Sequence, residues 1–269
     1  MLASFLITFR EGLEAFLIVG IILSYLNKLQ ATKYNKFIYL GVLFGILSSL
    51  VIAYVFQVVI YDIEDENYKH YMMIGILMFA TVVLSYMVIW MANQSKNIKG
   101  EIEQNLTNLV TAGNIAGMVF LAFLAVIREG FESVLFFSSL SFAENMTMEE
   151  GLIGAVLGLV LSIALVYALM RGAKNIPLKS FFKYTGLLIL IIAGGLFGSA
   201  VSMMQASELL PTIVPMVYDI SFVLDDRSVF GTFLRALFGY NSSPTLLHLL
   251  AWATYMVTAL FLWKRTYAK

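Results

Sequence analysis

The chain has 269 residues, of which 60% are hydrophobic and only 13% are charged, and its formal net charge is zero. Water-soluble domains carry about 25% charged residues, so this composition indicates a protein embedded in a lipid bilayer. The balanced charge gives no reason to expect nucleic-acid binding, and the absence of cysteine excludes disulfides, thiolate metal sites and iron–sulfur clusters.

Apolar segments follow one another along the whole chain. About 20 helical residues are needed to cross a bilayer. The first segment is too long for a signal peptide and lacks a basic start, so we expect a retained membrane helix. The predicted spans lie at about 2–26, 37–60, 70–92, 110–140, 150–170, 181–204 and 245–263. The sequence therefore predicts an all-α polytopic membrane protein with seven transmembrane helices.

The connections between these spans alternate in charge. Basic residues gather in NKLQATKYNK, NQSKNIKG, RGAKNIPLK and the C-terminal KRTYAK, whereas the other connections are acidic. Basic connections stay on the cytoplasmic side of a membrane. The pattern predicts an N-terminus outside and a C-terminus in the cytoplasm, in the inner or plasma membrane.

The first three predicted spans resemble the next three. SFLITFREGLEAFLIVG at 4–20 aligns with AFLAVIREGFESVLFFS at 122–138, and the segments at 41–54 and 154–167 share the pattern Gly-x3-Gly-x3-Ser-x4-Tyr. Units with an odd number of spans insert in opposite directions, and such inverted repeats are typical of secondary transporters. We expect one permease domain (1–269) containing repeat one (about 1–95), repeat two (about 108–205), an outer segment (about 205–244) and a seventh helix (about 245–263).

Each repeat places the charged motif Arg-Glu-Gly-x-Glu inside its first apolar span. Residues three and four apart share one face of a helix, so each motif presents its arginine and its second glutamate together. If all six side chains are ionised, two arginines and four glutamates sum to −2. Carboxylate oxygens are hard ligands that suit Fe³⁺, Ca²⁺, Mg²⁺ or Mn²⁺. The candidate metal ligands are Glu11, Glu14, Glu129 and Glu132, and the candidate orienting residues are Arg10 and Arg128.

Other interpretations of the motifs stay open at this point. The charges could form an ion pair that only locks two helices together, or they could relay protons. Ionisable residues inside a membrane nevertheless mark functional sites more often than packing sites. We expect each arginine to hold one carboxylate through two parallel hydrogen bonds.

Trp90, near a span end, suits the aromatic belt at the membrane interface, and the methionines suit apolar filler.

These residues resemble the oxidase-dependent iron permease family, which includes the yeast high-affinity iron permease and the bacterial Efe-type iron permeases. The family signature is Arg-Glu-x-x-Glu in the first and fourth of seven helices, here Arg10–Glu14 and Arg128–Glu132. The resemblance implies iron uptake, with Fe³⁺ supplied by a partner oxidase or iron-binding protein outside. It implies iron as the transported substrate, no prosthetic group, and motif glutamates as iron ligands.

The chain departs from the family pattern in its outer segment. Fungal members carry Asp-Ala-Ser-Glu where this chain has Gln205-Ala206-Ser207-Glu208, and many bacterial members have His and Glu where Ser202 and Met203 stand here. An accessory site at the outer surface is therefore expected to be altered. Its candidate residues are Gln205 and Glu208, with Asp62, Glu64, Asp65 and Glu66 in an acidic outer connection.

Three rival functions remain beside iron uptake, and one of them, a purely structural or assembly subunit, should tolerate conservative Glu→Gln changes. A carrier for divalent cations such as Fe²⁺, Mn²⁺ or Pb²⁺ would use the same carboxylates. A membrane enzyme would need an activated nucleophile, and the sequence offers no nucleophile–base pair apart from the four glutamates. We therefore expect a transporter and not an enzyme.

Overall fold

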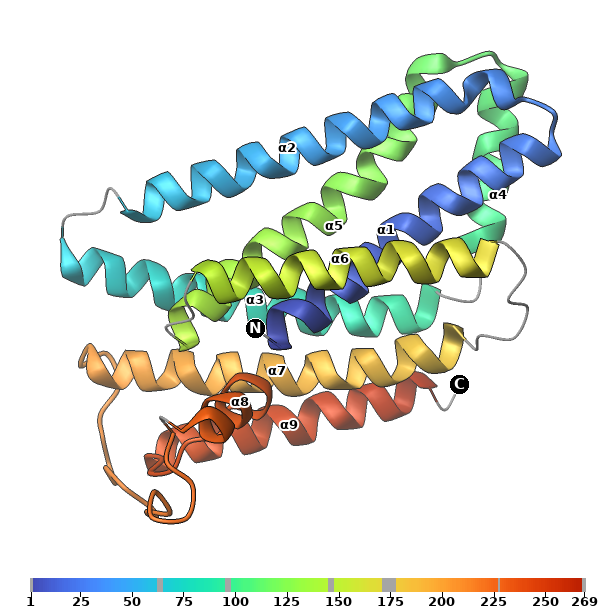
Figure 1. The fold of residues 1–269 in the computed structure, drawn as a ribbon. Helices are drawn as coiled ribbons and strands as arrows, with labels where there is room; N and C mark the ends of the chain where they lie inside the picture. The colour runs from blue at the N-terminus through green and yellow to red at the C-terminus, as the bar shows by residue number, and fades with distance from the viewer. Residues whose placement is uncertain are drawn as a thin grey trace.

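The computed structural model describes residues 2–61, 65–94, 98–144, 148–170, 178–226 and 228–267, and all regular structure within them is helical. The protein is a polytopic, all-α membrane protein (Figure 1). The helices are α1 (Leu2–Lys28), η1 (Thr32–Tyr34, a 3-10 turn), α2 (Asn35–Tyr61), α3 (Glu66–Gln94), α4 (Ile98–Thr111), α5 (Ile115–Glu144), α6 (Met148–Met170), α7 (Leu178–Ala206), α8 (Val229–Phe238) and α9 (Leu246–Tyr267).

Five of the described helices are long and apolar enough to cross a membrane by length and composition: α2, α3, α6, α7 and α9. Helices α1 and α5, with 27 and 30 residues, are as long but carry the charged motifs. All seven correspond to the predicted spans, and α1 and α5 are the predicted first and fourth.

The predicted fourth span is wrong at its start, because residues 110 and 111 belong to the separate helix α4. Gly113 adopts a left-handed φ of 61°, and Asn114 donates its backbone N–H to Leu109, which closes α4. The Asn114 side chain then accepts a 2.9 Å hydrogen bond from the backbone N–H of Gly117 and begins α5. A second helix not predicted, α8, lies in the outer segment and starts at Ser228, whose side chain accepts from Gly231 N–H.

The two repeats pack on each other reciprocally, α1 on α6 and α2 on α5. The motif glycine of α1, Gly12, lies against Ser162 of α6, so that an added Cβ would come 2.5 Å from the Ser162 hydroxyl. The motif glycine of α5, Gly130, lies in the same way against Ser49 of α2. Ser49 and Ser162 are the matching serines of the repeated Gly-x3-Gly-x3-Ser pattern. The sequence repeat is therefore also a repeat of contacts.

The spaced glycines make a second pair of matching contacts. Gly45 of α2 lies against Val126 of α5, and Gly158 of α6 lies against Thr8 of α1. These small residues allow close helix approach, as their spacing predicts. Within each pair of helices, residue numbers at successive contacts rise together on both helices. Helix α1 therefore runs parallel to α6, and α2 parallel to α5. Since α2 returns alongside α1, α1 and α5 run in opposite directions (Figure 1).

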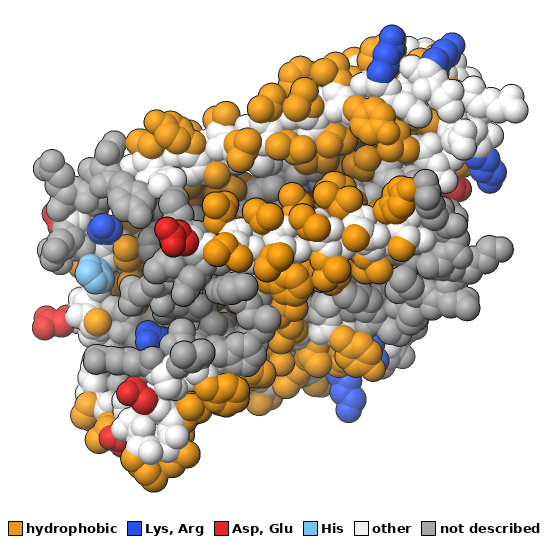
Figure 2. All heavy atoms as spheres, viewed as in Figure 1, with side chains coloured by type: hydrophobic (Ala, Val, Ile, Leu, Met, Phe, Trp, Pro, Cys, Tyr) orange, Lys and Arg blue, Asp and Glu red, His pale blue; other side chains and the backbone are white. Residues whose placement is uncertain are grey.

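The other three long helices, α3, α7 and α9, form a layer beneath α1, α2, α5 and α6 (Figure 1). The main core joins this layer to α1 through Ile7 and to α5 through Phe136, which belong to one buried cluster with Leu77 and Leu190. On the face of Figure 2, apolar side chains cover α2 and α6, as expected of helices that face lipid. Lys and Arg gather at the end of the bundle where α1 leads into α2, and most visible Asp and Glu lie at the opposite end.

Candidate metal site

The two charged motifs meet in the interior, where α1 packs against α5. Glu11, Glu14 and Glu129 are buried, and one carboxylate oxygen from each lies within 4.8 Å of the other two. Glu132, also buried, joins this group through Arg128, which contacts Glu14, Glu129 and Glu132. The structure thus brings together the four carboxylates that the sequence placed in two separate motifs.

Arg10 divides its guanidinium between two glutamates of its own helix. Its Nη1 lies 2.7 Å from Glu11 Oε1 and its Nη2 lies 2.7 Å from Glu14 Oε1. The expected pairing of one arginine with both oxygens of one carboxylate is therefore wrong. The helical spacing explains the difference, because Glu11 and Glu14 are three positions apart on neighbouring turns after Arg10, and each accepts from one nitrogen. This arrangement leaves a second oxygen on each glutamate for another partner.

Arg128 makes longer contacts than its repeat counterpart. Its Nε lies 3.3 Å from Glu129 Oε1 and 3.4 Å from Glu132 Oε1, and its Nη2 lies 4.0 Å from Glu14 Oε2 on the other repeat. The Arg128 side chain is 36% exposed, whereas that of Arg10 is 2% exposed. The two motifs are alike in sequence but not in geometry.

The site contains buried acceptors without donors. Oε2 of Glu11, Glu129 and Glu132 is inaccessible to solvent and has no hydrogen-bond partner among the described residues. Buried carboxylate oxygens in this state are costly unless a cation occupies the space between them. They come from both α1 and α5, so a cation held by them would bridge the two repeats. The donor set is all oxygen, as hard cations prefer.

Sequence reasoning missed two contacts that α3 makes with the motifs. Nη1 of Arg10 lies 3.3 Å from the sulfur of Met87, and the Arg128 guanidinium lies 4.5 Å from the centre of the Trp90 ring. Met87 is buried and Trp90 partly buried. The sequence analysis assigned Trp90 to the aromatic belt and Met87 to apolar filler, and so predicted neither contact. Their separation by three positions places both side chains on one face of α3 but does not identify the residues they meet, so the sequence carried no direct signal for these contacts.

The residues predicted for an accessory site are not gathered in one place. Asp62 and Glu64 fall outside the described residues, Asp65 is exposed next to α3, and only the backbone of Glu66 is described. Gln205 is buried, accepting a 2.7 Å hydrogen bond from the Thr245 hydroxyl and donating to the Pro211 carbonyl at 3.3 Å.

Glu208 lies past the end of α7, exposed and with a left-handed φ of 59°. Gln205 thus ties the outer segment to the start of α9, while Glu208 forms part of the turn that ends α7.

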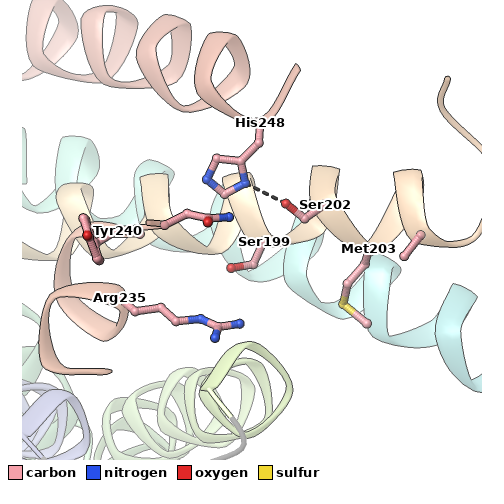
Figure 3. A pocket seen from close by; sticks show the side chains of 9 residues that line it. Ser199, Ser202, Met203, Arg235, Tyr240 and His248 are labelled. Carbon is pink, nitrogen blue, oxygen red and sulfur yellow. Dashed lines mark hydrogen bonds between the residues drawn. The ribbon is translucent and has the colours of Figure 1, made fainter. Parts of the chain in front are cut away.

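A separate cavity of about 260 Å³ lies between α7, α8 and α9 (Figure 3). His248 of α9 reaches across it, and its Nδ1 forms a 2.7 Å hydrogen bond with the Ser202 hydroxyl. The histidine thus places an imidazole beside Ser202 of α7. The described lining residues include the Arg235 guanidinium and no carboxylate, so a bare cation is not favoured there. The lining residues are Ser199, Ser202, Met203, Ala206, Arg235, Gly239, Tyr240, Asn241 and His248.

Comparison with known proteins agrees with these observations. The profile of the iron permease FTR1 family matches residues 1–266. The chain is 34% identical over 262 residues to the ferrous iron permease EfeU of Escherichia coli O6:K15:H31 (strain 536 / UPEC), covering 97% of this chain and 94% of the relative. It is 35% identical over 264 residues to the ferrous iron permease EfeU of Yersinia pestis, covering 97% and 93%. No solved structure matches. The chain therefore belongs to the iron permease FTR1 family, and its relatives indicate a transporter.

Proposed function

We propose that this protein takes up iron across the cytoplasmic membrane through a carboxylate site shared by its two repeats. In this proposal α1, α2, α3, α5, α6, α7 and α9 cross the membrane, with the N-terminus outside and the C-terminus in the cytoplasm. The chain is one permease domain, made of two inverted repeats and a seventh helix. The observation that carries the proposal is the group of carboxylate oxygens within 4.8 Å of one another, contributed by both repeats.

Each motif residue has a role in this proposal. Glu11, Glu14, Glu129 and Glu132 bind the ion, and Arg10 and Arg128 orient them. Because α1 and α5 run in opposite directions, Arg10 lies on the outer side of the carboxylates and Arg128 on the cytoplasmic side. An ion would enter past one arginine and leave past the other, and each arginine would offset the carboxylate charge when the site is empty.

The charge of the site favours a divalent ion. Four glutamates and two arginines sum to −2, which Fe²⁺ neutralises, whereas Fe³⁺ leaves an excess positive charge inside the membrane. The relatives from E. coli and Y. pestis are named ferrous iron permeases. We therefore propose Fe²⁺ as the substrate, in place of the Fe³⁺ implied by the initial resemblance. A partner oxidase outside the membrane is needed only if Fe³⁺ is the ion.

Substitution of one glutamate from each motif tests the site. We expect Glu14→Ala and Glu132→Ala each to abolish uptake of radioactive iron, because each removes a ligand and leaves an arginine with fewer partners. The matched control is Glu149→Ala, at an exposed glutamate of α6. Membrane abundance of each variant is measured by immunoblot. Near-normal uptake by both motif variants at normal abundance rules out the site.

The identity of the ion is tested with proteoliposomes. Fe²⁺ kept reduced by ascorbate is expected to enter, while Fe³⁺ citrate without a reductant is not. Mn²⁺ is expected to compete weakly, since its ligand preferences are similar. Uptake of Fe³⁺ alone would replace the ferrous proposal by a ferric permease, and faster uptake of Mn²⁺ than of Fe²⁺ would replace it by a general carrier of divalent cations.

A further inference from the structure

Helix α3 contacts both arginines of the site. Its Met87 sulfur lies 3.3 Å from Arg10 Nη1, and its Trp90 ring lies 4.5 Å from the Arg128 guanidinium. Three positions along a helix correspond to a rise of about 4.5 Å, so the two side chains stand one above the other on one face. One helix of the first repeat therefore reaches the motifs of both repeats.

The two arginines provide an internal comparison, because they belong to the same motif. Arg10, next to a thioether, lies 2.7 Å from each of its two glutamates. Arg128, stacked on an aromatic ring, lies 3.3 and 3.4 Å from its own two. A guanidinium is attracted to the face of an indole ring, and most strongly when water is excluded. The stacking thus accounts for the weaker ion pairs of Arg128.

We propose that Trp90 is a positioning residue of the ion site, which holds the Arg128 guanidinium away from Glu129 and Glu132 and so leaves their oxygens to the transported metal. An arginine at 2.7 Å would compete with the metal for these oxygens, because both are cations. This inference rests on the proposed function. In the proposed orientation, Trp90 acts on the cytoplasmic side of the carboxylates, where the ion leaves.

Metal titration of purified variants tests the proposal. Mn²⁺ is the probe, and its Kd is measured by isothermal titration calorimetry in detergent. Trp90→Leu is expected to raise the Kd roughly 3- to 30-fold, the range of a lost cation–π contact, and Trp90→Phe to raise it less. The matched control is Trp263→Leu, because the cation stacked on the Trp263 ring, at 5.5 Å, is Lys183, which lies outside the motifs in sequence. An unchanged or lower Kd in Trp90→Leu overturns the proposal.

A double-mutant cycle separates positioning from packing. If Trp90 acts through Arg128, Trp90→Leu has no further effect on the Mn²⁺ Kd in an Arg128→Gln background. The same increase in both backgrounds overturns the proposal in favour of a packing role. Glu14→Gln binding Mn²⁺ as tightly as the wild type would instead refute the proposed function, so the two failures are distinguishable.

Fluorescence provides a test that does not remove Trp90 or Arg128. The chain has three tryptophans, so replacing Trp252 and Trp263 with Phe leaves Trp90 as the only one. We expect Mn²⁺ to change its emission with the Kd found by calorimetry, because the ion adds a second positive charge close to the ring while Arg128 stays stacked on it. Emission that stays constant through saturation overturns the proposal.

Discussion

At the scale of the residue, Arg10 is the most buried charged residue in the part of the molecule that the structure describes. It is 1% exposed and contacts Glu11 and Glu14 at 2.7 Å. Removing one partner of a buried ion pair leaves an uncompensated charge in a medium that solvates it poorly. The Arg128 side chain is partly exposed and lies farther from its partners, so it contributes less to the stability of the folded state. The two repeats thus use the same residue with different structural consequences.

This difference predicts unequal effects of matched substitutions. Arg10→Gln is expected to destabilise the protein by about 3–5 kcal/mol, the cost of breaking a buried pair. Arg128→Gln is expected to cost clearly less, because its contacts are longer and its side chain is 36% exposed. Thermal unfolding in detergent, followed by circular dichroism, compares the two. Equal losses of stability would contradict the asymmetry of the site.

At the scale of the element, the helices that carry the carboxylates are held by close glycine contacts. Gly12 leaves room for the Ser162 side chain. The Ser162 hydroxyl donates a 2.7 Å hydrogen bond to the Leu159 carbonyl of its own helix. A methyl group at position 12 would come 2.5 Å from the Ser162 hydroxyl, so α1 and α6 would have to separate. The glycine inside each motif is therefore a packing residue, placed between residues that carry charge.

Gly12→Ala is accordingly expected to lower stability by about 1–3 kcal/mol, as overpacking does. The second change Ser162→Ala should restore most of the loss, because it removes the hydroxyl that the new methyl group meets. Gly75→Ala, where an added Cβ meets nothing within 4 Å, is the matched control and should be neutral or slightly stabilising. Fluorescence-detected size-exclusion chromatography after heating measures all three, and a loss in Gly75→Ala equal to that in Gly12→Ala would refute this account.

Much of this level could be predicted from the sequence. The long apolar segments predicted helices close to their observed bounds, and the repeated glycines indicated close helix packing without identifying which helices meet. The break at Gly113 and the short helix α8 were missed, because both depend on local backbone geometry and capping, a left-handed Gly113 in one case and the Ser228 cap in the other. The stacking of Trp90 on Arg128 depends on how α3 packs against α5, which no spacing within one helix reveals.

At the scale of the whole molecule, two halves in opposite orientations meet at one group of charges. The parallel pairs α1–α6 and α2–α5 follow directly from the matching contacts of the two repeats. Such pairing places the motifs at the same depth, and the ends of the bundle differ in charge in the view of Figure 2. The orientation we propose follows from that difference, since positive connections are retained in the cytoplasm.

The absence of cysteine makes this orientation directly testable. Single cysteines at Phe222, 85% exposed in the outer segment, and at exposed Lys33, before α2, would be the only thiols in the chain. A membrane-impermeant maleimide is expected to label position 222 in intact cells and position 33 only after lysis. The opposite result would invert the proposed direction of every helix.

The central claim is that carboxylates of both repeats bind one transported ion. It is tested most directly by a structure of the protein with Mn²⁺, in which the ion is located by its anomalous scattering. Our account predicts a single strong peak between α1 and α5, with oxygen ligands from Glu11 or Glu14 and from Glu129 or Glu132. A peak bound by one helix alone, or one in the cavity beside His248 with none between the motifs, would contradict it.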